Sequence, residues 1–506
     1  MSLAVVHSRA LDALRSPPVT VEVHLANGLP SFTLVGLADT EVKEARERVR
    51  AALQTSGLEF PTNKRITVNL APADLPKESG RFDLPIAIGI LAASGQIEAA
   101  RLAAFEFAGE LSLAGELRPV RGALAMALAA AHEATEPPRA MVLPADSAAQ
   151  AAHVHGVCIH AASHLLDVVR ALLPGPAATP LPWAEPLALP LAPPVADLRD
   201  VKGQAAAKRA LEIAAAGGHS VLLVGPPGSG KSMLAQRFPG LLPPLTHDEA
   251  IESAALLSLT TAGGSHRWGE RVLRAPHHSA SSAALVGGGS PPRPGEISLA
   301  HHGVLFLDEL PEYPRQALEA LREPLETGRV TISRAARQCD YPARFQLLAA
   351  MNPCPCGHHG SPLHDCRCTP DEVTRYQSRL SGPLLDRIDL QVEVPAVAPQ
   401  ALSAAADGEP SARIAERVAA ARGRALERQG VLNHGLAGEA LERHGALDAA
   451  TDAFLQHATL RLGWSARGFH RVLRVARSIA DLAGSERIAL PHVAEAVQYR
   501  RVMAAR

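Results

Sequence analysis

The sequence has neither a strong charge of one sign nor a long apolar run. Its 50 Lys and Arg residues and 51 Asp and Glu residues leave a formal net charge of −1 over 506 residues. Such a balance gives no global field that would attract nucleic acid, so any site for a polyanion must be local. No stretch of about 18 uninterrupted apolar residues predicts a transmembrane helix. Because the first residues are also too weakly apolar for a signal peptide, we expect a cytoplasmic protein.

Cysteine and lysine are both scarce. Six cysteines in a cytosolic chain favour a metal site or free thiols over disulfides. Only six lysines accompany 44 arginines, and the last of the six is Lys231. A planar guanidinium cannot replace a compact ammonium in a tight oxygen-lined cradle. A lysine at position 231 in a chain that prefers arginine therefore supports a specific role for its ammonium.

The clearest motif occupies residues 225–232 and matches the phosphate-binding loop G-x-x-x-x-G-K-[ST]. Its glycines let backbone N–H groups approach a triphosphate, while Lys231 reaches the β- and γ-phosphates and Ser232 ligates Mg²⁺. The alternative is a chance glycine-rich turn. The apolar strand predicted before the loop and the helix start after it favour nucleotide binding. The residues expected to bind ATP are Gly225, Pro226, Pro227, Gly228, Ser229, Gly230, Lys231 and Ser232.

A second nucleotide signature lies at residues 303–310, where an apolar run ends in Asp308 and Glu309. Ligands of parallel α/β sheets bind at the carboxyl ends of the strands. Asp308 is therefore expected to hold the same Mg²⁺ through water, and Glu309 to polarise the attacking water. A strand that simply ends in a solvated turn is the alternative, but the phosphate-binding loop upstream favours the catalytic interpretation.

A third strand, residues 346–351, ends in Asn352, whose amide can hold the attacking water or the γ-phosphate. The whole pattern resembles the AAA+ ATPases, in which this position is called sensor 1. That resemblance implies that Arg387 is the arginine finger of the magnesium-chelatase and MCM branch, reaching a nucleotide held by the neighbouring subunit. The alternative is a surface salt-bridge cluster with Asp386 and Asp389, which would contribute little stability.

The C-terminal part is predicted to be helical. Ser465 is a good N-cap, and an apolar stripe at helical spacing follows it. The stripe consists of Phe469, Val472, Leu473, Ala476, Ile479 and Ala480. The AAA+ resemblance implies that Arg467 is the sensor 2 residue of a helical lid. A solvated basic face is the alternative, and we expect it to hold for Arg474 and Arg477.

Residues 174–195 are rich in Pro, Ala and Leu and are nearly uncharged, which predicts a semi-rigid linker. The linker separates an N-terminal domain at residues 1–173 from an ATPase core at residues 196–398. A helical lid domain is expected at residues 399–506.

Three further stretches, residues 19–30, 69–77 and 351–357, resemble the YifB/ComM family of magnesium-chelatase-like bacterial proteins. The fold implied is α/β, with an AAA+ P-loop parallel sheet and helical lid, preceded by a Lon-protease-like (ribosomal S5-like) α+β domain. The activity implied is that of a hexameric, ATP- and Mg²⁺-dependent DNA helicase driving branch migration during recombination in natural transformation. The partners implied are single-stranded and branched DNA, further copies of the chain, and a RecA-type recombinase.

Two other functions remain open at this stage. One is a chelatase-like motor that remodels a porphyrin-processing partner, although the chain lacks an integrin-like domain. The other is a Lon-like protease. It is disfavoured because Ile86 stands where the nucleophile would be and residues 123–130 contain no lysine, so no activated nucleophile can be built from these positions.

Two Cys-x-Cys pairs stand nine residues apart, with three histidines among them. The pairs are Cys354 with Cys356 and Cys366 with Cys368. Four thiolates on one short loop can close a tetrahedral Zn²⁺ site, although Cys-x-Cys is tighter than the usual spacing. The alternative is a set of free or redox-labile thiols. The histidine doublets at 277–278 and 301–302 lack carboxylate or third-ligand neighbours and are interpreted as structural or phosphate-facing.

Two inserts are candidates for contact with DNA. Residues 330–341 alternate like a β-hairpin with Arg334 and Arg337 near its tip, between the second and third motifs. MCM-type motors carry a pore hairpin at this place. Residues 285–296 form a Gly/Pro-rich loop with Arg293, at the place of the helix-2 insert of these motors.

Overall fold

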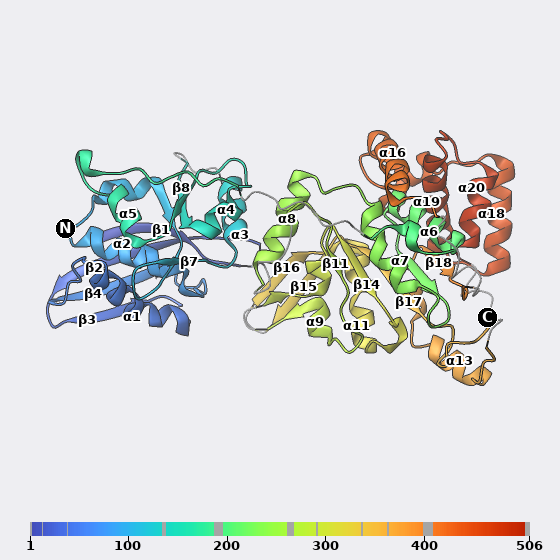
Figure 1. Ribbon diagram of the computed structural model, residues 1–506, viewed down its shortest axis with the longest axis horizontal. Coiled ribbons are helices and arrows are strands. Elements are labelled where there is room, and N and C mark those ends of the chain that lie inside the picture. The colour runs from blue at the N-terminus through green and yellow to red at the C-terminus, as the bar shows by residue number, and fades with distance from the viewer. Residues whose placement is uncertain are drawn as a thin grey trace. The chain divides into compact units, whose positions relative to one another are not determined.

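The computed structural model describes residues 3–12, 14–37, 39–133, 138–186, 196–260, 268–289, 292–334, 337–361, 364–397 and 408–500. These residues form two compact units. The first comprises Met1–Pro190 and Ala250–Trp268, and the second comprises Leu191–Glu249 and Gly269–Arg506. Each unit has its own sheet (Figure 1).

The first unit is built on a seven-stranded mixed sheet in the order β3-β4-β2-β1-β5-β8-β9. Its long central strands alternate between buried and exposed side chains, as expected of strands with one face on a core. The strands are β1 (Leu3–Arg9), β2 (Pro18–Asn27), β3 (Ser31–Val35), β4 (Lys64–Ala71), β5 (Phe105–Phe107), β8 (Ala140–Pro144) and β9 (Ile159–Ala162), and the small hairpin is β6 (Glu110–Leu111) with β7 (Leu117–Arg118).

Helix α2 is the centre of this unit. It is apolar on every side, and ten of its eleven residues are buried. Gly89 lets it lie directly on the sheet, because a Cβ there would overlap the Val23 side chain. The helices of the unit are α1 (Thr40–Thr55), α2 (Asp83–Ala93), α3 (Ala123–His132), α4 (Ala145–Ala151) and α5 (Leu165–Ala171).

Two segments pack on the first unit although no sequence pattern predicts this. Ile251 and Ala255 of α8 (His247–Ser258) are buried in one cluster with Leu124 and Leu143. The stretch expected to be a linker begins with a 3-10 turn at Gly175–Ala177. It then passes along β9, where the Ala184 amide donates to the Ile159 carbonyl at 2.9 Å. The rest of that stretch, residues 187–195, lies outside the described residues.

The second unit contains a five-stranded parallel sheet in the order β11-β14-β17-β10-β18. Its three central strands are buried along their whole length, as expected when helices cover both faces. The strands are β10 (Val221–Val224), β11 (Leu273–Arg274), β14 (Val304–Leu307), β17 (Gln346–Met351) and β18 (Leu390–Glu393). Two hairpins stand beside the sheet, β12 (Gly287–Gly288) with β13 (Arg293–Pro294), and β15 (Arg329–Arg334) with β16 (Arg337–Pro342).

Helices surround this sheet and form the C-terminal part of the unit (Figure 1). Around the sheet lie α6 (Ala205–Gly217), α7 (Lys231–Arg237), α9 (Ser282–Val286), α10 (Glu296–Leu299), α11 (Arg315–Ala320), α12 (Arg322–Thr327) and α14 (Gly382–Leu385). Helix α13 (Pro370–Gln377) is drawn apart from the sheet, at the lower right of Figure 1. The C-terminal helices are α16 (Ser411–Gln429), α17 (Gly438–His444), α18 (Ala449–Leu462), α19 (Ala466–Leu482) and α20 (Leu490–Gln498).

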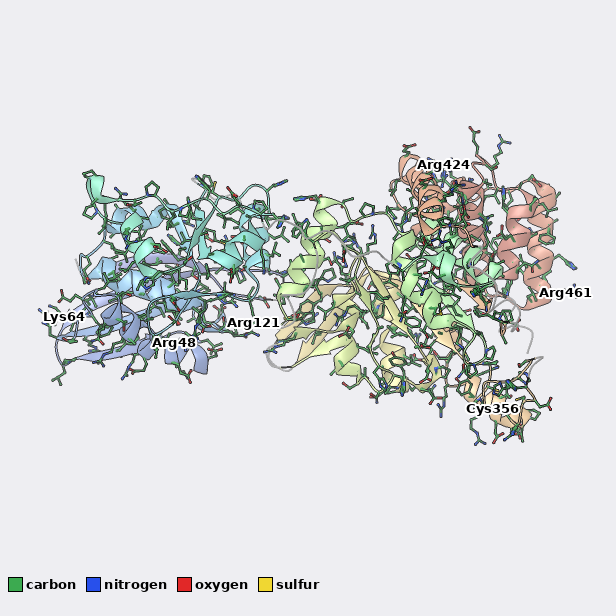
Figure 2. The ribbon with its side chains drawn as sticks, viewed as in Figure 1. Arg48, Lys64, Arg121, Cys356, Arg424 and Arg461 are labelled. Carbon is green, nitrogen blue, oxygen red and sulfur yellow. The ribbon has the colours of Figure 1, made fainter. Side chains whose placement is uncertain are left out.

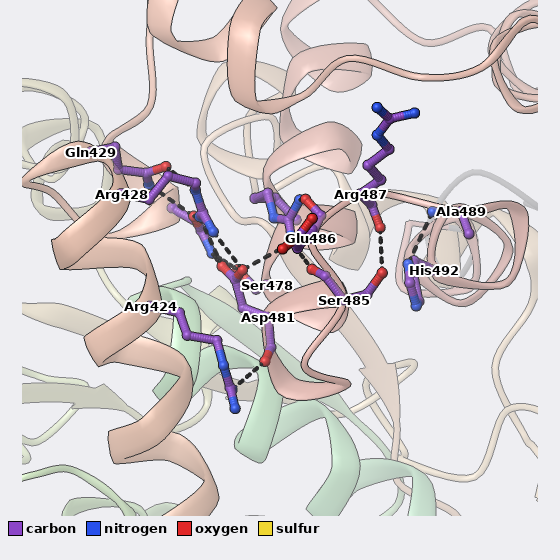
Figure 3. Close-up of polar contacts among 12 residues, drawn as sticks. Arg424, Arg428, Gln429, Ser478, Asp481, Ser485, Glu486, Arg487, Ala489 and His492 are labelled. Atoms are coloured by element: carbon purple, nitrogen blue, oxygen red, sulfur yellow. Dashed lines mark hydrogen bonds and ion pairs between the residues drawn. The ribbon is translucent and has the colours of Figure 1, made fainter.

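The apolar stripe expected on α19 is confirmed, because Val472, Ala476 and Ile479 are buried in the same core as α6 and the sheet. The expectation of a solvated basic face is wrong for Arg477. Its side chain is 2% exposed and pairs with Asp481, which also receives two hydrogen bonds from Arg428 (Figure 3). Arg477 therefore serves the packing of the C-terminal helices. No described helix is both long and apolar enough to cross a membrane.

Candidate nucleotide-binding site

The phosphate-binding loop lies between β10 and α7, at the carboxyl edge of the parallel sheet. Gly228 and Gly230 have φ values of +74° and +92°, a region that favours glycine. Gly225 is required for another reason, since a Cβ there would overlap the carbonyl oxygen of Val394. The local backbone conformation therefore explains Gly228 and Gly230, whereas a contact with a distant segment explains Gly225.

The ammonium of Lys231 folds back on this loop. Its Nζ donates to the carbonyl oxygens of Gly225 at 2.7 Å and Pro226 at 2.8 Å, and to Oδ1 of Asn352 at 3.2 Å. Burial lowers the pKa of Lys231, and the carboxylates of Asp308 and Glu309 counteract part of that effect. The ammonium thus lies among three oxygen atoms of the chain.

Asp308 and Asn352 reach the same edge from neighbouring strands. The Ser232 hydroxyl donates to Oδ2 of Asp308 at 2.6 Å, so the two oxygen ligands expected for Mg²⁺ already lie together. β14 and β17 are parallel and adjacent, which brings their carboxyl ends beside the loop that follows β10. The structure therefore brings together Lys231, Ser232, Asp308 and Asn352.

Glu309 has a φ of +52°, an uncommon backbone conformation for a residue other than glycine. Its carboxylate is about half exposed, and Oε2 lies 3.0 Å from Nδ1 of His278. The sequence interpretation did not pair these residues. The signal available was position alone, since His278 follows β11, the strand beside β14. His278 now holds the carboxylate expected to act on water.

Arg387 lies at the opposite edge of the sheet. The Ser220 hydroxyl, at the start of β10, donates to the backbone carbonyl of Arg387, and β18 begins three residues later. A four-residue strand, at about 3.3 Å per residue, separates this edge from the phosphate-binding loop. Arg387 therefore does not meet the nucleotide site of its own chain.

The guanidinium of Arg387 is nearly buried. It donates to Oε1 of Glu326 at 2.7 Å and to the Pro383 carbonyl at 2.7 Å. The alternative, a surface salt-bridge cluster of Arg387 with Asp386 and Asp389, does not form. Asp389 is buried against Arg471, and Asp386 pairs with Arg500. Burial raises the pKa of Asp389, but the nearby His219 and Arg471 outweigh it and hold the pKa well below its usual range.

Arg467 is exposed in the first turn of α19. Within the described part of the chain, no hydrogen bond or ion pair connects it to the phosphate-binding loop. Arg471, one turn further on, is the arginine that contacts the core, through Asp389. The structure therefore does not assemble Arg467 with the residues at the carboxyl edge.

The two inserts expected near DNA contact one another. Gly287 of the first hairpin approaches the second so closely that a Cβ would lie 2.6 Å from Cδ1 of Ile332, and the Tyr341 hydroxyl donates to the Pro292 carbonyl at 2.9 Å. Arg293 is exposed. Arg334 and Arg337 face each other in the register of β15 and β16, but their side chains and residues 335–336 lie outside the described structure.

The four clustered cysteines converge on one point of the loop before α13. Figure 2 labels one of them, Cys356. The Sγ–Sγ distances are 3.4 Å for Cys354–Cys356, 3.7 Å for Cys354–Cys366 and 3.6 Å for Cys356–Cys366, and all four sulfurs lie within 4.8 Å of one another. A tetrahedron with Zn–S bonds of about 2.3 Å has edges of about 3.8 Å, whereas a disulfide requires about 2.05 Å. The spacing therefore fits four ligands of one ion and does not fit a disulfide.

The electrostatics of the loop suit a cation. Backbone N–H groups of His358 and Arg367 lower the pKa of the Cys356 thiol to about 6. For Cys368 the amide of Cys356 has the same effect, but desolvation and the neighbouring sulfurs outweigh it and raise the pKa. One thiolate thus forms readily, and its negative charge disfavours ionisation of the neighbouring thiols. A bound dication would offset this repulsion between thiolates.

The N-terminal unit has no nucleophile at the expected position. Ile86 is fully buried in α2, and α3 begins at Ala123 with apolar residues. The polar group nearest to Ile86 in sequence is Asp83, which pairs with Arg48. Burial raises the pKa of Asp83 to about 6, against the opposing effect of Arg48.

Comparison with known proteins identifies a family along nearly the whole chain. Three family profiles match: "Magnesium chelatase, subunit ChlI" at residues 197–402, "Subunit ChlI of Mg-chelatase" at 21–147, and "Magnesium chelatase, subunit ChlI C-terminal" at 408–500. The chain is 51% identical to uncharacterized protein YifB of Salmonella typhimurium, over 99% of this chain and 98% of the relative. It is 50% identical to competence protein ComM of Haemophilus influenzae, with the same coverage. Uncharacterized protein Rv2897c of Mycobacterium tuberculosis is 42% identical over the full length of both chains.

Proposed function

The chain belongs to the magnesium-chelatase-like family that includes YifB and ComM, and on this basis we propose that it is an ATP-driven DNA motor. The motor assembles into a ring, a hexamer when active, and drives branch migration of recombining DNA during natural transformation. The observation that supports the ATPase is the convergence of Lys231, Ser232, Asp308 and Asn352 at one edge of a parallel sheet.

Each residue of this cluster has a defined task in the proposed reaction. Lys231 leaves the carbonyls of Gly225 and Pro226 and binds the β- and γ-phosphates, and the amides of residues 225–232 surround them. Ser232 and Asp308, whose oxygens lie 2.6 Å apart, would hold Mg²⁺, Asp308 through water, and the ion would supply positive charge to the phosphates. Glu309 orients the attacking water and accepts its proton, while Asn352 holds the water or the γ-phosphate.

The same proposal gives Arg387 a role between subunits. Because it lies at the sheet edge away from its own phosphate-binding loop, the nucleotide that it is proposed to serve is that of a neighbouring copy. A guanidinium there would stabilise the charge that develops during phosphoryl transfer. Arg467 is proposed to sense nucleotide from the lid, which requires the lid to move on binding.

We propose that DNA contacts the paired hairpins. Arg293, Arg334 and Arg337 all lie on these two inserts, which support each other through Gly287 and Tyr341. Arginines bind phosphates bidentately and without sequence preference, which suits a translocating motor. The RecA-type recombinase is proposed as the partner that supplies the joint to be extended.

We propose a Lon-like, ribosomal S5-like fold for the N-terminal unit, without protease activity. Ile86 occupies the nucleophile position and its surroundings are apolar. The unit would then serve ring assembly or guide DNA.

We also propose that Cys354, Cys356, Cys366 and Cys368 hold one Zn²⁺. The sulfur spacing and the amide donors to Cys356 support this assignment. Elemental analysis of the purified protein should find about one zinc per chain. A Cys354→Ser/Cys356→Ser variant should lose it, and a metal-free wild type of normal stability would leave only free thiols.

The decisive test of the function is the rate of ATP hydrolysis with and without single-stranded and forked DNA. Lys231→Ala should abolish ATP binding, whereas Glu309→Gln should bind ATP, remain assembled and not turn over. Turnover of Glu309→Gln at the wild-type rate would remove the role assigned to Glu309.

The name of the matched profile favours one alternative, a chelatase-like motor that remodels a protein partner. Such a motor would hydrolyse ATP with the same residues. Its hydrolysis would not respond to DNA, so the assay above separates the two functions.

A further inference from the structure

The cysteine loop lies directly against the phosphate-binding loop. Gly357 follows Cys356 and has a φ of +84°. A Cβ on Gly357 would stand 2.5 Å from Cδ and 2.8 Å from Cγ of Pro227, and 3.8 Å from Cγ of Asn352. Gly357 therefore touches two of the elements expected to surround a triphosphate.

Both ends of the cysteine loop are connected to Asn352. Cys354 lies two residues after Asn352 in the chain, and the Gly357 amide donates to the Cys354 carbonyl at 3.0 Å. Cys368 is followed by Thr369, which caps α13. From that helix Gln377 donates to the carbonyl of Pro353, the residue after Asn352, at 2.9 Å.

We propose that the metal at the four cysteines is a brace for the nucleotide site, so that occupancy of the metal site and affinity for ATP are coupled. The inference rests on the zinc assignment and on the nucleotide site proposed above. A tetrahedral ion fixes Cys354 and Cys356 to Cys366 and Cys368, and so fixes Gly357 against Pro227. Without the ion, the cysteine sulfurs are connected to one another only by contacts of 3.4–3.7 Å between Cys354, Cys356 and Cys366 among the described residues.

The coupling acts through Asn352 and Pro227. Asn352 Oδ1 accepts a hydrogen bond from Lys231, so movement at the base of the cysteine loop reaches the ammonium that binds phosphate. Pro227 is an exposed residue of the phosphate-binding loop, and Gly357 of the cysteine loop lies next to its side chain. The metal would thus act as a positioning element, remote from the reacting atoms.

Gly357→Ala tests the contact without removing a cysteine. The new methyl group would clash with Pro227 and disturb this contact, while all four cysteines are retained. We expect about one zinc per chain and a loss of affinity for a fluorescent ATP analogue with Mg²⁺ of about tenfold or more. Gly360→Ala is the matched control, because Gly360 lies in the same loop at a φ of +76° with nothing within 4 Å of its Cβ position. It carries the same backbone strain and should leave nucleotide affinity within about twofold.

Thermodynamic reciprocity gives a second test, which needs no variant. If zinc strengthens nucleotide binding by a given factor, nucleotide must strengthen zinc binding by the same factor. Zinc affinity of the wild type, measured by competition with a chromogenic chelator, should therefore rise about tenfold when the Mg²⁺-bound ATP analogue is saturating.

The outcomes distinguish the coupling from the assignments beneath it. A Gly357→Ala protein with zinc and unchanged nucleotide affinity, or a zinc affinity indifferent to nucleotide, would overturn the coupling alone. A wild type without zinc would overturn the metal assignment, and a wild type that binds no nucleotide would overturn the proposed function.

Discussion

Arg387 is held by a carboxylate of its own chain, and this contact leads to a quantitative prediction. If Arg387 serves a neighbouring subunit, it must first leave Glu326, which lies 2.7 Å away on α12. The Arg387 side chain is 7% exposed and that of Glu326 is 42% exposed. A pair that is half in solvent contributes about 0.5 to 1 kcal/mol once screening is included.

Glu326→Gln should therefore make Arg387 more available. A free-energy change of about 0.5 to 1 kcal/mol corresponds to a two- to fivefold change in the free fraction. We expect DNA-stimulated ATP hydrolysis at saturating ATP to rise by about that factor, while the midpoint of thermal unfolding falls slightly. Glu439→Gln is the matched control, because it removes a comparable ion pair with Arg443, at 2.9 Å, on the exposed surface of α17.

Subunit mixing identifies the partner of the arginine. Arg387→Ala and Glu309→Gln should each be inactive alone, and a mixture should recover part of the activity. An active Arg387→Ala protein, or a Glu326→Gln protein whose activity falls in step with its stability, would show that the pair is structural and that the reasoning is wrong.

Two further predictions concern the hairpin and the buried carboxyl. The Arg334→Ala/Arg337→Ala variant should keep basal ATP hydrolysis and assembly but lose strand displacement. The slope of log DNA affinity against log salt concentration should be flatter by about 1.4 to 1.8 units. Arg443→Ala/Arg461→Ala on the lid is the control, and unwinding that survives in the hairpin variant would exclude the hairpin as the DNA contact. The pKa of Asp83 is raised to about 6, so its neutral form stabilises the fold below pH 4 and that contribution is lost as pH rises through 6. Asp83→Asn should remove this loss of stability with rising pH. Hydrogen exchange of α2 amides should show the free energy of unfolding of the variant rising relative to that of the wild type by up to about 3 kcal/mol between pH 4 and 7. A difference that does not change with pH would refute the raised pKa of Asp83.

Much of the nucleotide site could be predicted from the sequence because its determinants are local. Gly228 and Gly230 adopt backbone conformations that favour glycine, and the reason is contained in the loop itself. Asp308 and Asn352 each follow a short apolar run, and parallel strands place their carboxyl ends at one edge whatever else the fold does. The cysteine spacing likewise predicted a four-sulfur cluster, and the sulfurs do converge.

Other features depended on which surfaces pack together, and no sequence pattern contains that information. Glu326 and Arg387 are far apart in the chain, as are His278 and Glu309, and only the arrangement of strands and helices brings each pair within 3.0 Å. Arg477 looked like part of a solvated stripe, but Asp481 and the neighbouring helix bury it, because a long side chain can pack its methylenes while its charge is paired. Local backbone conformation and strand order thus determine where the loop of residues 225–232 and the strand ends beside it lie, whereas packing between distant segments decides which charged side chains pair with one another.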